Sequence, residues 1–536
     1  MPRTLHQLLT PIQSTGGYYN FSNIRYAQPP VGELRFRAPV APSGRNITID
    51  NGSIGRICPQ ANPAWYLIAA QFVPAYLTGQ PFNLTAAEGA LAGASSKLPP
   101  QDPRTTEDCL FLDVVVPQNI FKKATKESRN DDKKSNCGAP VLVWIYGGGY
   151  TAGEKTGFGT YNPAGLLKAS QASGSEGVVY VALNYRLGAF GWISGPTLQS
   201  DGTANAGLYD QRLALQWIQK NIHLFGGDPN RVTVFGESAG GGSIFHQITA
   251  FGGLAGPAPF QQAVLQSAAW QNNPSNFQQE LTAQSYLKLL NVSTIEEVRL
   301  LPSSALITAN IIQVGGSAYG QFTYGPVVDG LFAPALPGKL LLQGSFDKNL
   351  KLLIGHNADE GLDFSSPAIT NDTAYGQLVT TSYPDISPSA ASYIENVLYP
   401  PDFSGKFGYK DEIGREVLTI ADSSFTCTSK YLDRAFGNRT YAYEFSVPPA
   451  LHGQDIPYTF FNGPNTAVKS DATAKALQAY ITSFAETGVP SGSGIPVFPL
   501  YGNNSEILNL DATSITEKKD DTANARCLWW QKGLYY

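Results

Sequence analysis

The chain has 536 residues, a length that fits roughly three or four average domains or one large α/β domain. Hydrophobic residues make up 42% of it, charged residues 15% and aromatic residues 11%, a composition that indicates a globular core and excludes an intrinsically disordered chain. The 37 basic and 42 acidic residues are spread evenly and give a net charge of −5, so no nucleic-acid-binding surface is expected. No apolar run reaches about 18 residues, which predicts that no segment spans a membrane.

Strand and helix signals alternate along the chain. Residues 141–146 and 177–184 are continuously apolar, as in strands that helices cover on both faces. The order then predicts a helix, a strand, a helix and two further strands, at residues 207–225, 231–235, 239–249, 350–354 and 441–445. We therefore predict a single domain over residues 1–536, built on a wound, mostly parallel sheet with long insertions. The charged segment 122–134 is expected to be a surface loop.

Cysteines and glycosylation motifs bear on the cellular compartment. Five cysteines are too few and too scattered for a disulfide-rich scaffold or a zinc site, and their odd number leaves one thiol unpaired. Asn-x-Ser/Thr motifs, roughly twice as many as chance would supply, favour a secreted glycoprotein. They begin at Asn20, Asn46, Asn51, Asn83, Asn291, Asn371, Asn438 and Asn503. Residues 1–20 have no signal-peptide pattern, so we interpret the chain as a mature secreted sequence without one; an intracellular protein with chance motifs is the alternative.

A G-x-S-x-G motif, Gly236-Glu237-Ser238-Ala239-Gly240, lies between a predicted strand and a predicted helix. This context places Ser238 in a tight turn that its small neighbours permit, with the hydroxyl at the helix N-terminus. There the helix dipole and the N–H of Ala239 face any oxygen that becomes negatively charged. Ser238 is therefore the candidate nucleophile, and an idle serine in a glycine-rich turn is the alternative.

A serine hydroxyl needs a base to remove its proton, and the chain offers five histidines. His6 lies in the N-terminal segment, His223 lies near the start of the preceding strand, and His246 lies about 12 Å further along the serine's own helix. His356 follows a predicted strand and remains possible. His452 lies in a loop just after the predicted strand 441–445, where functional residues gather in such sheets, and we predict it as the base.

The third residue of such a site orients the imidazole and stabilises its cationic form. The loop after the predicted strand 350–354 carries two adjacent carboxylates, Asp359 and Glu360. Neighbouring residues on a loop point in different directions, so only one of them can serve. The loop pattern alone does not separate the two.

Backbone donors for an oxyanion are expected in Gly147-Gly148-Gly149, directly after the predicted strand 141–146, because glycine lets the backbone approach a substrate closely. A phosphate loop is the alternative, since residues 148–156 nearly match G-x-x-x-x-G-K-[ST]. Glu154 interrupts that motif, and we reject it. Neither H-E-x-x-H nor a paired C-x-x-C occurs, so no metal or cofactor is expected.

Several ordered segments together resemble the type B carboxylesterase family, which includes fungal lipases of the Candida rugosa kind and cholinesterases. These segments are residues 26–32, 34–36, 107–110, 147–149, 184–188, 210–215 and 236–240. The resemblance runs from about Phe21 to the C-terminus. It implies the α/β-hydrolase fold and hydrolysis of carboxylic esters.

The resemblance also implies a role for individual residues. Ser238 would be the nucleophile, Glu360 rather than Asp359 the acid, and His452 the base. The oxyanion donors would be the amides of Gly148, Gly149 and Ala239, with Glu237 and Ser267 in supporting positions. Structural features implied in the same way are the disulfides Cys58–Cys109 and Cys427–Cys527, the free thiol Cys137, and the buried ion pairs Arg35–Glu107 and Arg186–Asp210.

The loop that the first implied disulfide closes, residues 58–109, resembles the mobile lid of the lipase branch. Its apolar residues 65–70 and 72–77 favour a lid over hydrophobic acyl chains that contacts a lipid interface, and buried core is an equal alternative. We predict a secreted serine carboxylesterase that acts on small to medium hydrophobic esters through an acyl-enzyme. Alternatives are a lipase or sterol esterase, an acyltransferase of secondary metabolism, and a non-catalytic binding protein on the same fold. The sequence does not assign the oligomeric state.

Overall fold

The computed structural model describes residues 8–13, 16–44, 49–94, 100–127, 138–172, 174–269 and 275–536. Its strands are β1 (Leu8–Leu9), β2 (Ile12–Gln13), β3 (Tyr18–Arg25), β4 (Ile49–Asp50), β5 (Phe111–Pro117), β6 (Ala139–Ile145), β7 (Val179–Leu183), β8 (Gly227–Glu237), β9 (Gln262–Gln266), β10 (Lys351–Asn357), β11 (Tyr441–Phe445), β12 (Glu506–Leu510) and β13 (Ile515–Lys519). Within the described residues, eleven of them form one sheet in the order β13-β12-β11-β10-β9-β8-β6-β7-β5-β3-β2.

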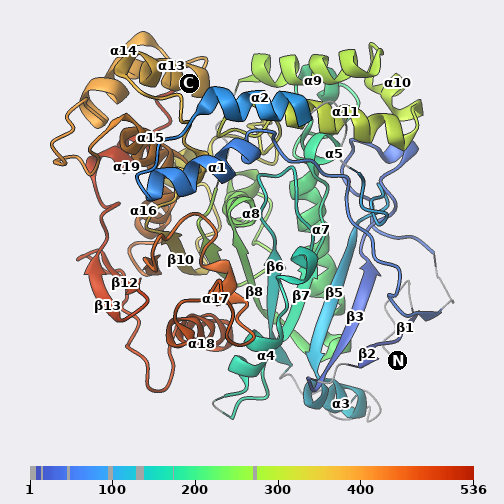
Figure 1. Cartoon of the computed structure of the whole chain (residues 1–536). Helices are drawn as coiled ribbons and strands as arrows, with labels where there is room; N and C mark the ends of the chain where they lie inside the picture. The colour runs from blue at the N-terminus through green and yellow to red at the C-terminus, as the bar shows by residue number, and fades with distance from the viewer. Residues whose placement is uncertain are drawn as a thin grey trace.

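Helices surround this sheet (Figure 1). They are α1 (Tyr66–Leu77), α2 (Leu84–Ala94), α3 (Gln118–Glu127), α4 (Ala164–Ser170), α5 (Gly188–Trp192), α6 (Pro196–Gln199), α7 (Ala206–Asn221), α8 (Ala239–Ile248), α9 (Asn276–Leu290), α10 (Ile295–Leu300), α11 (Ser303–Gly315), α12 (Pro337–Gln343), α13 (Asp372–Ser382), α14 (Pro388–Tyr393), α15 (Glu412–Ala421), α16 (Cys427–Ala435), α17 (Ile456–Thr459), α18 (Asp471–Thr487) and α19 (Ala525–Gln531).

The centre of the sheet is parallel, as the sequence predicts. Strands β7, β6, β8, β9, β10, β11 and β12 pair in parallel, and antiparallel pairs occur only toward its two edges in the described chain. Every residue of β6 and β7 is buried, which matches their continuously apolar sequences. Because parallel strands end at the same edge, the loops after β6, β8, β10 and β11 meet there.

Two sequence expectations about local structure need correction. Residues 122–127 of the charged segment belong to helix α3 instead of a loop, because Ile120 and Phe121 pack against the core while the lysines face outward. The remainder of that segment, 128–134, lies outside the described residues. Strand β8 begins at Gly227, four residues before the predicted start, since its first residue pairs with Ala139 of β6.

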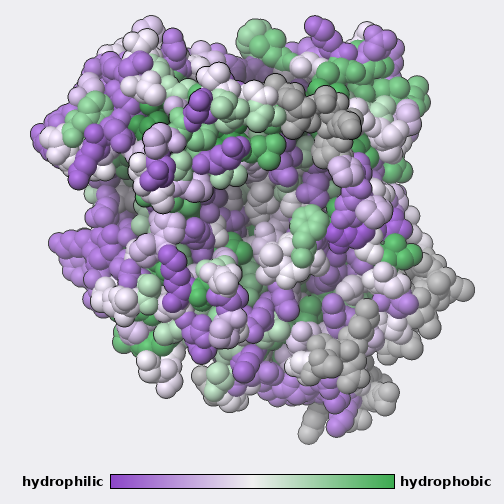
Figure 2. Space-filling view, in the orientation of Figure 1, coloured by the Kyte–Doolittle hydropathy of each residue, from purple (hydrophilic) through white to green (hydrophobic). Residues whose placement is uncertain are grey.

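Helices α1 and α2 lie within the loop that the disulfide Cys58–Cys109 closes, across the upper end of the sheet in Figure 1. Helix α1 buries Ile68, Ala69, Phe72 and Val73 on its inner side. Figure 2 shows hydrophobic and hydrophilic residues interspersed over this part of the surface. A second disulfide, Cys427–Cys527, joins α16 to α19. Within the described chain, no helix has both the length and the apolar character that a membrane span requires.

Two buried ion pairs link segments that lie far apart in the sequence. The guanidinium of Arg35 makes two hydrogen bonds of 2.7 and 2.8 Å to Glu107, and that of Arg186 makes two of the same lengths to Asp210. The side chains of the second pair are 3% and 0% exposed. Burial raises the pKa of Asp210 despite the neighbouring guanidinium. Removing one partner of such a pair destabilises the fold, because the other charge would remain buried without compensation.

Removing Arg186 alone is expected to destabilise the fold strongly. The change Arg186→Met should lower the free energy of unfolding by about 3–5 kcal/mol, measured by urea denaturation. The double change Arg186→Met/Asp210→Leu should lower it by less, because no charge remains buried without a partner. The control Lys475→Met removes an exposed pair with Asp471 at 4.0 Å and should change little. Equal losses for the single and double variants would contradict an uncompensated charge as the cause.

Candidate active site

Ser238 lies between β8 and α8, at the turn predicted for a nucleophile. Its backbone angles, φ 56° and ψ −125°, belong to a sparsely populated region for a residue with a side chain. The turn is held because the Ser238 N–H donates to the carbonyl of Gln266 on β9, at 3.0 Å. This geometry presents the side chain at the N-terminal end of α8.

The glycines of the motif are sterically required. A Cβ atom at Gly236 would lie 2.6 Å from the carbonyl oxygen of Ile145, and one at Gly240 would lie 2.0 Å from the same oxygen. Both distances are far below van der Waals contact. The motif therefore allows α8 to cross β6 closely enough to support the turn at Ser238.

The loop after β6 presents backbone donors beside this serine. Gly148 and Gly149 have φ values of +104° and +60°, which favour glycine, and a Cβ at Gly149 would meet the ring of Phe322 at 2.1 Å. Within the described residues, the N–H groups of Gly148, Gly149 and Ala239 donate to no protein acceptor. Three free donors next to a serine hydroxyl form a site suited to a negatively charged oxygen.

Glu360 and His452 come together from the loops that follow β10 and β11. The Oε2 atom of Glu360 lies 2.5 Å from Nδ1 of His452, and its Oε1 accepts the N–H of Asn357 at 2.6 Å. The Asn357 side chain also donates to the carbonyl of Leu451, which ties the two loops together. Burial alone would raise the pKa of Glu360, but the charge of His452 and these hydrogen bonds hold it below its usual value. The buried Ser267 hydroxyl adds to this effect.

A second carboxylate lies on the other side of the same imidazole. Glu237 Oε1 is 3.3 Å from Nε2 of His452. Burial raises the pKa of Glu237 to about 8, and the carboxylates of Asp455 and Glu360 add to the shift while His452 opposes it. Burial disfavours the charged form of His452 too, but Glu237 and Glu360 outweigh it and raise its pKa to about 9.

The structure separates the alternatives that the residue pattern left open. Asp359 makes no hydrogen bond to His452, and its Oδ1 has no partner within the described chain, so Glu360 is the carboxylate that contacts the imidazole. His356 lies on β10, where its Nε2 is 3.7 Å from Glu444. His246 is buried on α8, and burial lowers its pKa to about 3. Neither histidine belongs to this site.

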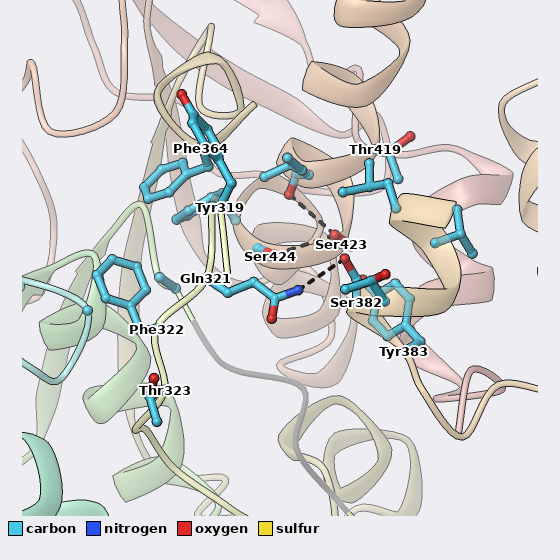
Figure 3. A pocket seen from close by; sticks show the side chains of 18 of the residues that line it. Tyr319, Gln321, Phe322, Thr323, Phe364, Ser382, Tyr383, Thr419, Ser423 and Ser424 are labelled. Carbon is cyan, nitrogen blue, oxygen red and sulfur yellow. Dashed lines mark hydrogen bonds between the residues drawn. The ribbon is translucent and has the colours of Figure 1, made fainter. Parts of the chain in front are cut away.

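Two cavities meet at Ser238. One, of about 220 Å³, is lined by Ser238, Gly149 and Ala239 and by the residues labelled in Figure 3. The other, of about 540 Å³, is lined by Ser238, Gly148 and His452. Phe322 and Phe364 line both, and so form the boundary between them.

The sequence analysis did not predict three aromatic residues of the site. The rings of Phe364 and Phe425 lie 5.2 and 4.5 Å from the imidazole of His452, measured between ring centroids. Phe322 packs against Gly149. Phe322 lies in an irregular segment, Phe364 in a three-residue 3-10 turn, Leu362–Phe364, and Phe425 in a short π-helical turn, Asp422–Thr426, so no periodic pattern marked them.

The remaining predicted positions are the glycosylation motifs, the cysteine expected to be free, and the residues of the rejected phosphate loop. Seven of the glycosylation motifs lie in the described chain with their asparagines exposed or partly exposed, at Asn20, Asn51, Asn83, Asn291, Asn371, Asn438 and Asn503. Asn46 and Cys137 lie outside the described residues. The residues of the rejected phosphate loop have another role, because Lys155 is buried in an ion pair with Asp113 at 3.1 Å.

Comparisons with known proteins agree with this geometry. Residues 9–530 match the model of the carboxylesterase family. The chain belongs to the carboxylesterase family. It is a carboxylic ester hydrolase, and the resemblance identified from the sequence is confirmed.

Two relatives of this carboxylesterase and one solved structure match it over more than nine tenths of its length. Carboxylesterase patB of Penicillium expansum is 41% identical over 529 residues, which cover 97% of this chain and 93% of the relative. Lipase 4 of Diutina rugosa is 29% identical and covers 94% of this chain and 91% of the relative. Among solved structures, Aspergillus niger EstA superposes with a TM-score of 0.78 at 23% identity, covering 98% of this chain and 96% of that one. These neighbours confirm the predicted α/β-hydrolase fold.

The two carboxylates around His452 predict an unusual titration for this carboxylesterase. Its imidazole should titrate well above the ordinary value of about 6.5. The change Glu237→Gln should lower that pKa, because it removes a negative charge that stabilises the imidazolium. Histidine resonances followed by NMR across pH would measure this, since the chain has five histidines and His452→Asn would assign the signal.

The matched control for this titration is Glu444→Gln. It removes a carboxylate from His356, whose pKa is raised by Glu444 against the effect of burial. This change should lower the pKa of His356 and leave that of His452 unaltered. A His452 titration that does not respond to Glu237→Gln would contradict the assigned electrostatics.

Proposed function

We propose that this enzyme hydrolyses small to medium carboxylic esters by a Ser-His-Glu mechanism with an acyl-enzyme on Ser238. The observation that carries the proposal is the contact between Glu360 and Nδ1 of His452, in a site where His452 and Ser238 line the same cavity. Nε2 makes no hydrogen bond in the described chain, and Glu237 Oε1 lies 3.3 Å from it as an ion-pair partner.

In the first half of the reaction, His452 takes the proton of Ser238 while the Ser238 oxygen attacks the ester carbonyl carbon. The carbonyl oxygen becomes negatively charged and accepts hydrogen bonds from Gly148, Gly149 and Ala239. Glu360 stabilises the imidazolium. The carbon–oxygen bond to the alcohol then breaks, and His452 gives its proton to the departing alkoxide.

In the second half, water replaces the alcohol. His452 takes a proton from water as the water oxygen attacks the acyl carbon, and a second oxyanion forms in the same place. The bond to Ser238 breaks, the serine recovers its proton from His452, and the carboxylic acid leaves. No cofactor takes part in these steps.

The two cavities divide the substrate between them. The leaving oxygen has to lie beside His452, which protonates it, and His452 lines only the larger cavity of the two. The alcohol part therefore lies in the cavity of about 540 Å³ and the acyl part in the cavity of about 220 Å³. The smaller volume favours short or medium acyl groups, since sites for drug-sized ligands measure about 300–1,000 Å³.

A lipase is the second candidate, because α1 covers the site with apolar side chains. Phe72 and Val73 of α1 pack with Leu362 and Leu451, next to the loops that carry Glu360 and His452. Relatives that include secreted lipases of Arthroderma benhamiae and Botryotinia fuckeliana support both this candidate and an extracellular location, together with the accessible glycosylation motifs. Activity that rises sharply above the solubility limit of a triglyceride would favour the lipase.

The direct test of the proposed reaction is the hydrolysis of p-nitrophenyl esters from acetate to palmitate by the enzyme and by Ser238→Ala. We expect activity with a maximum at short or medium chains and a loss of about 10⁴-fold or more in kcat for the variant. Ester hydrolysis that persists in Ser238→Ala would contradict the mechanism.

The neighbouring carboxylates provide a matched pair of variants. Glu360→Gln keeps the shape of the side chain but removes its charge, so kcat should fall by about 10⁴-fold. Asp359→Asn makes the same change one residue away and should leave kcat within a few-fold of the parent enzyme. Equal effects of the two changes would mean that Glu360 is not the orienting acid.

A further inference from the structure

We infer that the acyl cavity selects acyl groups that are apolar next to the ester carbonyl and carry a hydrogen-bonding oxygen, such as a ketone, further along. The inference rests on the proposed function, because it uses the assignment of the smaller cavity to the acyl part. The structural basis is the unequal distribution of polar side chains along that cavity.

The part of the cavity nearest the reacting carbonyl is aromatic. Phe322 packs against Gly149, and Phe364 and Phe425 pack on the imidazole of His452. Phe364 and Phe425 also contact each other, with ring centroids 5.1 Å apart. An acyl group that enters from Ser238 therefore meets the ring surfaces of Phe322, Phe364 and Phe425 first. The hydroxyl of Tyr319, which has no hydrogen-bond partner in the described chain, belongs to another residue that lines the cavity.

The other part of the cavity carries several polar side chains, and apolar residues that include Tyr383 beside Ser382 also line it. Figure 3 shows Phe322, Phe364 and Tyr319 on one side of the view and Gln321, Ser382, Ser423 and Ser424 toward the other. These four residues come from three elements: the loop before Thr323, the end of α13, and the π-helical turn Asp422–Thr426. Polar side chains from three separate elements thus converge on one cavity.

The polar groups there keep unused hydrogen-bonding capacity. The amide nitrogen of Gln321 donates to Ser382 Oγ at 3.3 Å, and its amide oxygen accepts no hydrogen bond from the described chain. Ser423 is 5% exposed, yet the hydrogen bonds of its hydroxyl to the Ile420 carbonyl and to Ser424 Oγ are both 3.4 Å long. Such long contacts are weak, so a ligand oxygen could replace them with shorter ones.

The Gln321 loop is held in place and does not depend on a ligand to order it. The indole N–H of Trp65 donates to the Gln321 carbonyl at 2.9 Å, and the Gln321 N–H donates to the Ala318 carbonyl at 3.0 Å. A Cβ at Gly320 would lie 2.3 Å from the carbonyl oxygen of Phe364, which shows how closely the loop packs. Groups that are fixed in advance discriminate between ligands at a lower entropic cost.

These features predict the sign of a substrate preference. In a purely apolar cavity, an acyl group with a methyl group should react better than its ketone counterpart, because the ketone loses hydration without compensation. With Gln321 and the serines as partners, the ketone should react better, since the apolar counterpart leaves them unpaired. The preference should appear only when the oxygen lies far enough from the ester to pass the aromatic part.

The experiment compares p-nitrophenyl esters in matched pairs, in which a ketone oxygen is replaced by a methyl group. The pairs are 4-oxopentanoate with 4-methylpentanoate, 5-oxohexanoate with 5-methylhexanoate, and 6-oxoheptanoate with 6-methylheptanoate. Each kcat/KM is divided by the rate of hydroxide hydrolysis of the same ester, which removes differences in intrinsic reactivity. At the best length we expect the ketone to be preferred about tenfold, the effect of one good hydrogen bond.

Variants assign the preference to these residues. Gln321→Leu keeps the approximate size of the side chain but removes the amide, and Ser382→Ala removes the hydroxyl that Gln321 contacts; each should reduce the preference to about twofold or less. The control is Gln377→Leu on α13, whose side chain is exposed and does not line the cavity; it should keep the full preference. Thermal unfolding followed by circular dichroism checks that each variant is folded.

The outcomes separate this inference from the proposed function. Ser238-dependent hydrolysis in which the methyl compounds react equally well or better at every length overturns the inference and leaves the ester hydrolase intact. A ketone preference that Gln321→Leu and Ser382→Ala both leave unchanged also overturns it. Hydrolysis that does not depend on Ser238 overturns the proposed function itself.

Discussion

The site is organised around a fully buried carboxylate. Glu360 is 0% exposed, and a negative charge at such a place is stable only with close partners. Its two oxygens are occupied by the imidazole of His452 and the N–H of Asn357. This arrangement fixes both the ring orientation and the nitrogen that carries the proton toward Glu360, so that Nε2 points away from Glu360.

Parallel pairing of the central strands makes this arrangement possible. Strands β6, β8, β10 and β11 end at one edge, and each leads into a different part of the site: the glycine loop, the Ser238 turn, Glu360 and His452. Segments more than 300 residues apart in the sequence, such as Gly148 and His452, thereby line the same cavity. The sheet thus supplies the rigid frame, and the short loops at its edge supply the chemistry.

Glu237 places a second carboxylate next to the imidazole of His452. It faces Nε2 of His452 while Glu360 faces Nδ1, so the imidazole lies between two acids. Because burial raises the pKa of Glu237, that carboxyl can carry a proton near neutral pH. The neutral carboxyl then no longer stabilises the imidazolium of His452, which favours the neutral imidazole. In the proposed mechanism His452 has to be neutral when it accepts the serine proton, so this property bears on its proposed role.

Sequence predicted the parts of the molecule that depend on local pattern. The buried strands, the serine turn and its glycines follow from runs of apolar residues and from steric limits that one segment reveals, and the choice of His452 followed from elimination among five histidines. Family resemblance separated Glu360 from Asp359, whereas the residues alone did not, because the distinction depends on how one loop turns relative to another. The aromatic wall of Phe322, Phe364 and Phe425 and the polar end at Gln321 were not predicted, since they arise where irregular segments from distant parts of the chain meet.

The most direct test of the account is to identify the covalent intermediate. The enzyme would be mixed with excess p-nitrophenyl ester, quenched in acid within the first turnovers, digested and examined by mass spectrometry. The account predicts one acyl group per chain, on the peptide that contains Ser238, with the mass of the acyl part alone. Turnover without any acylated peptide, or with the acyl group on another residue, would contradict it.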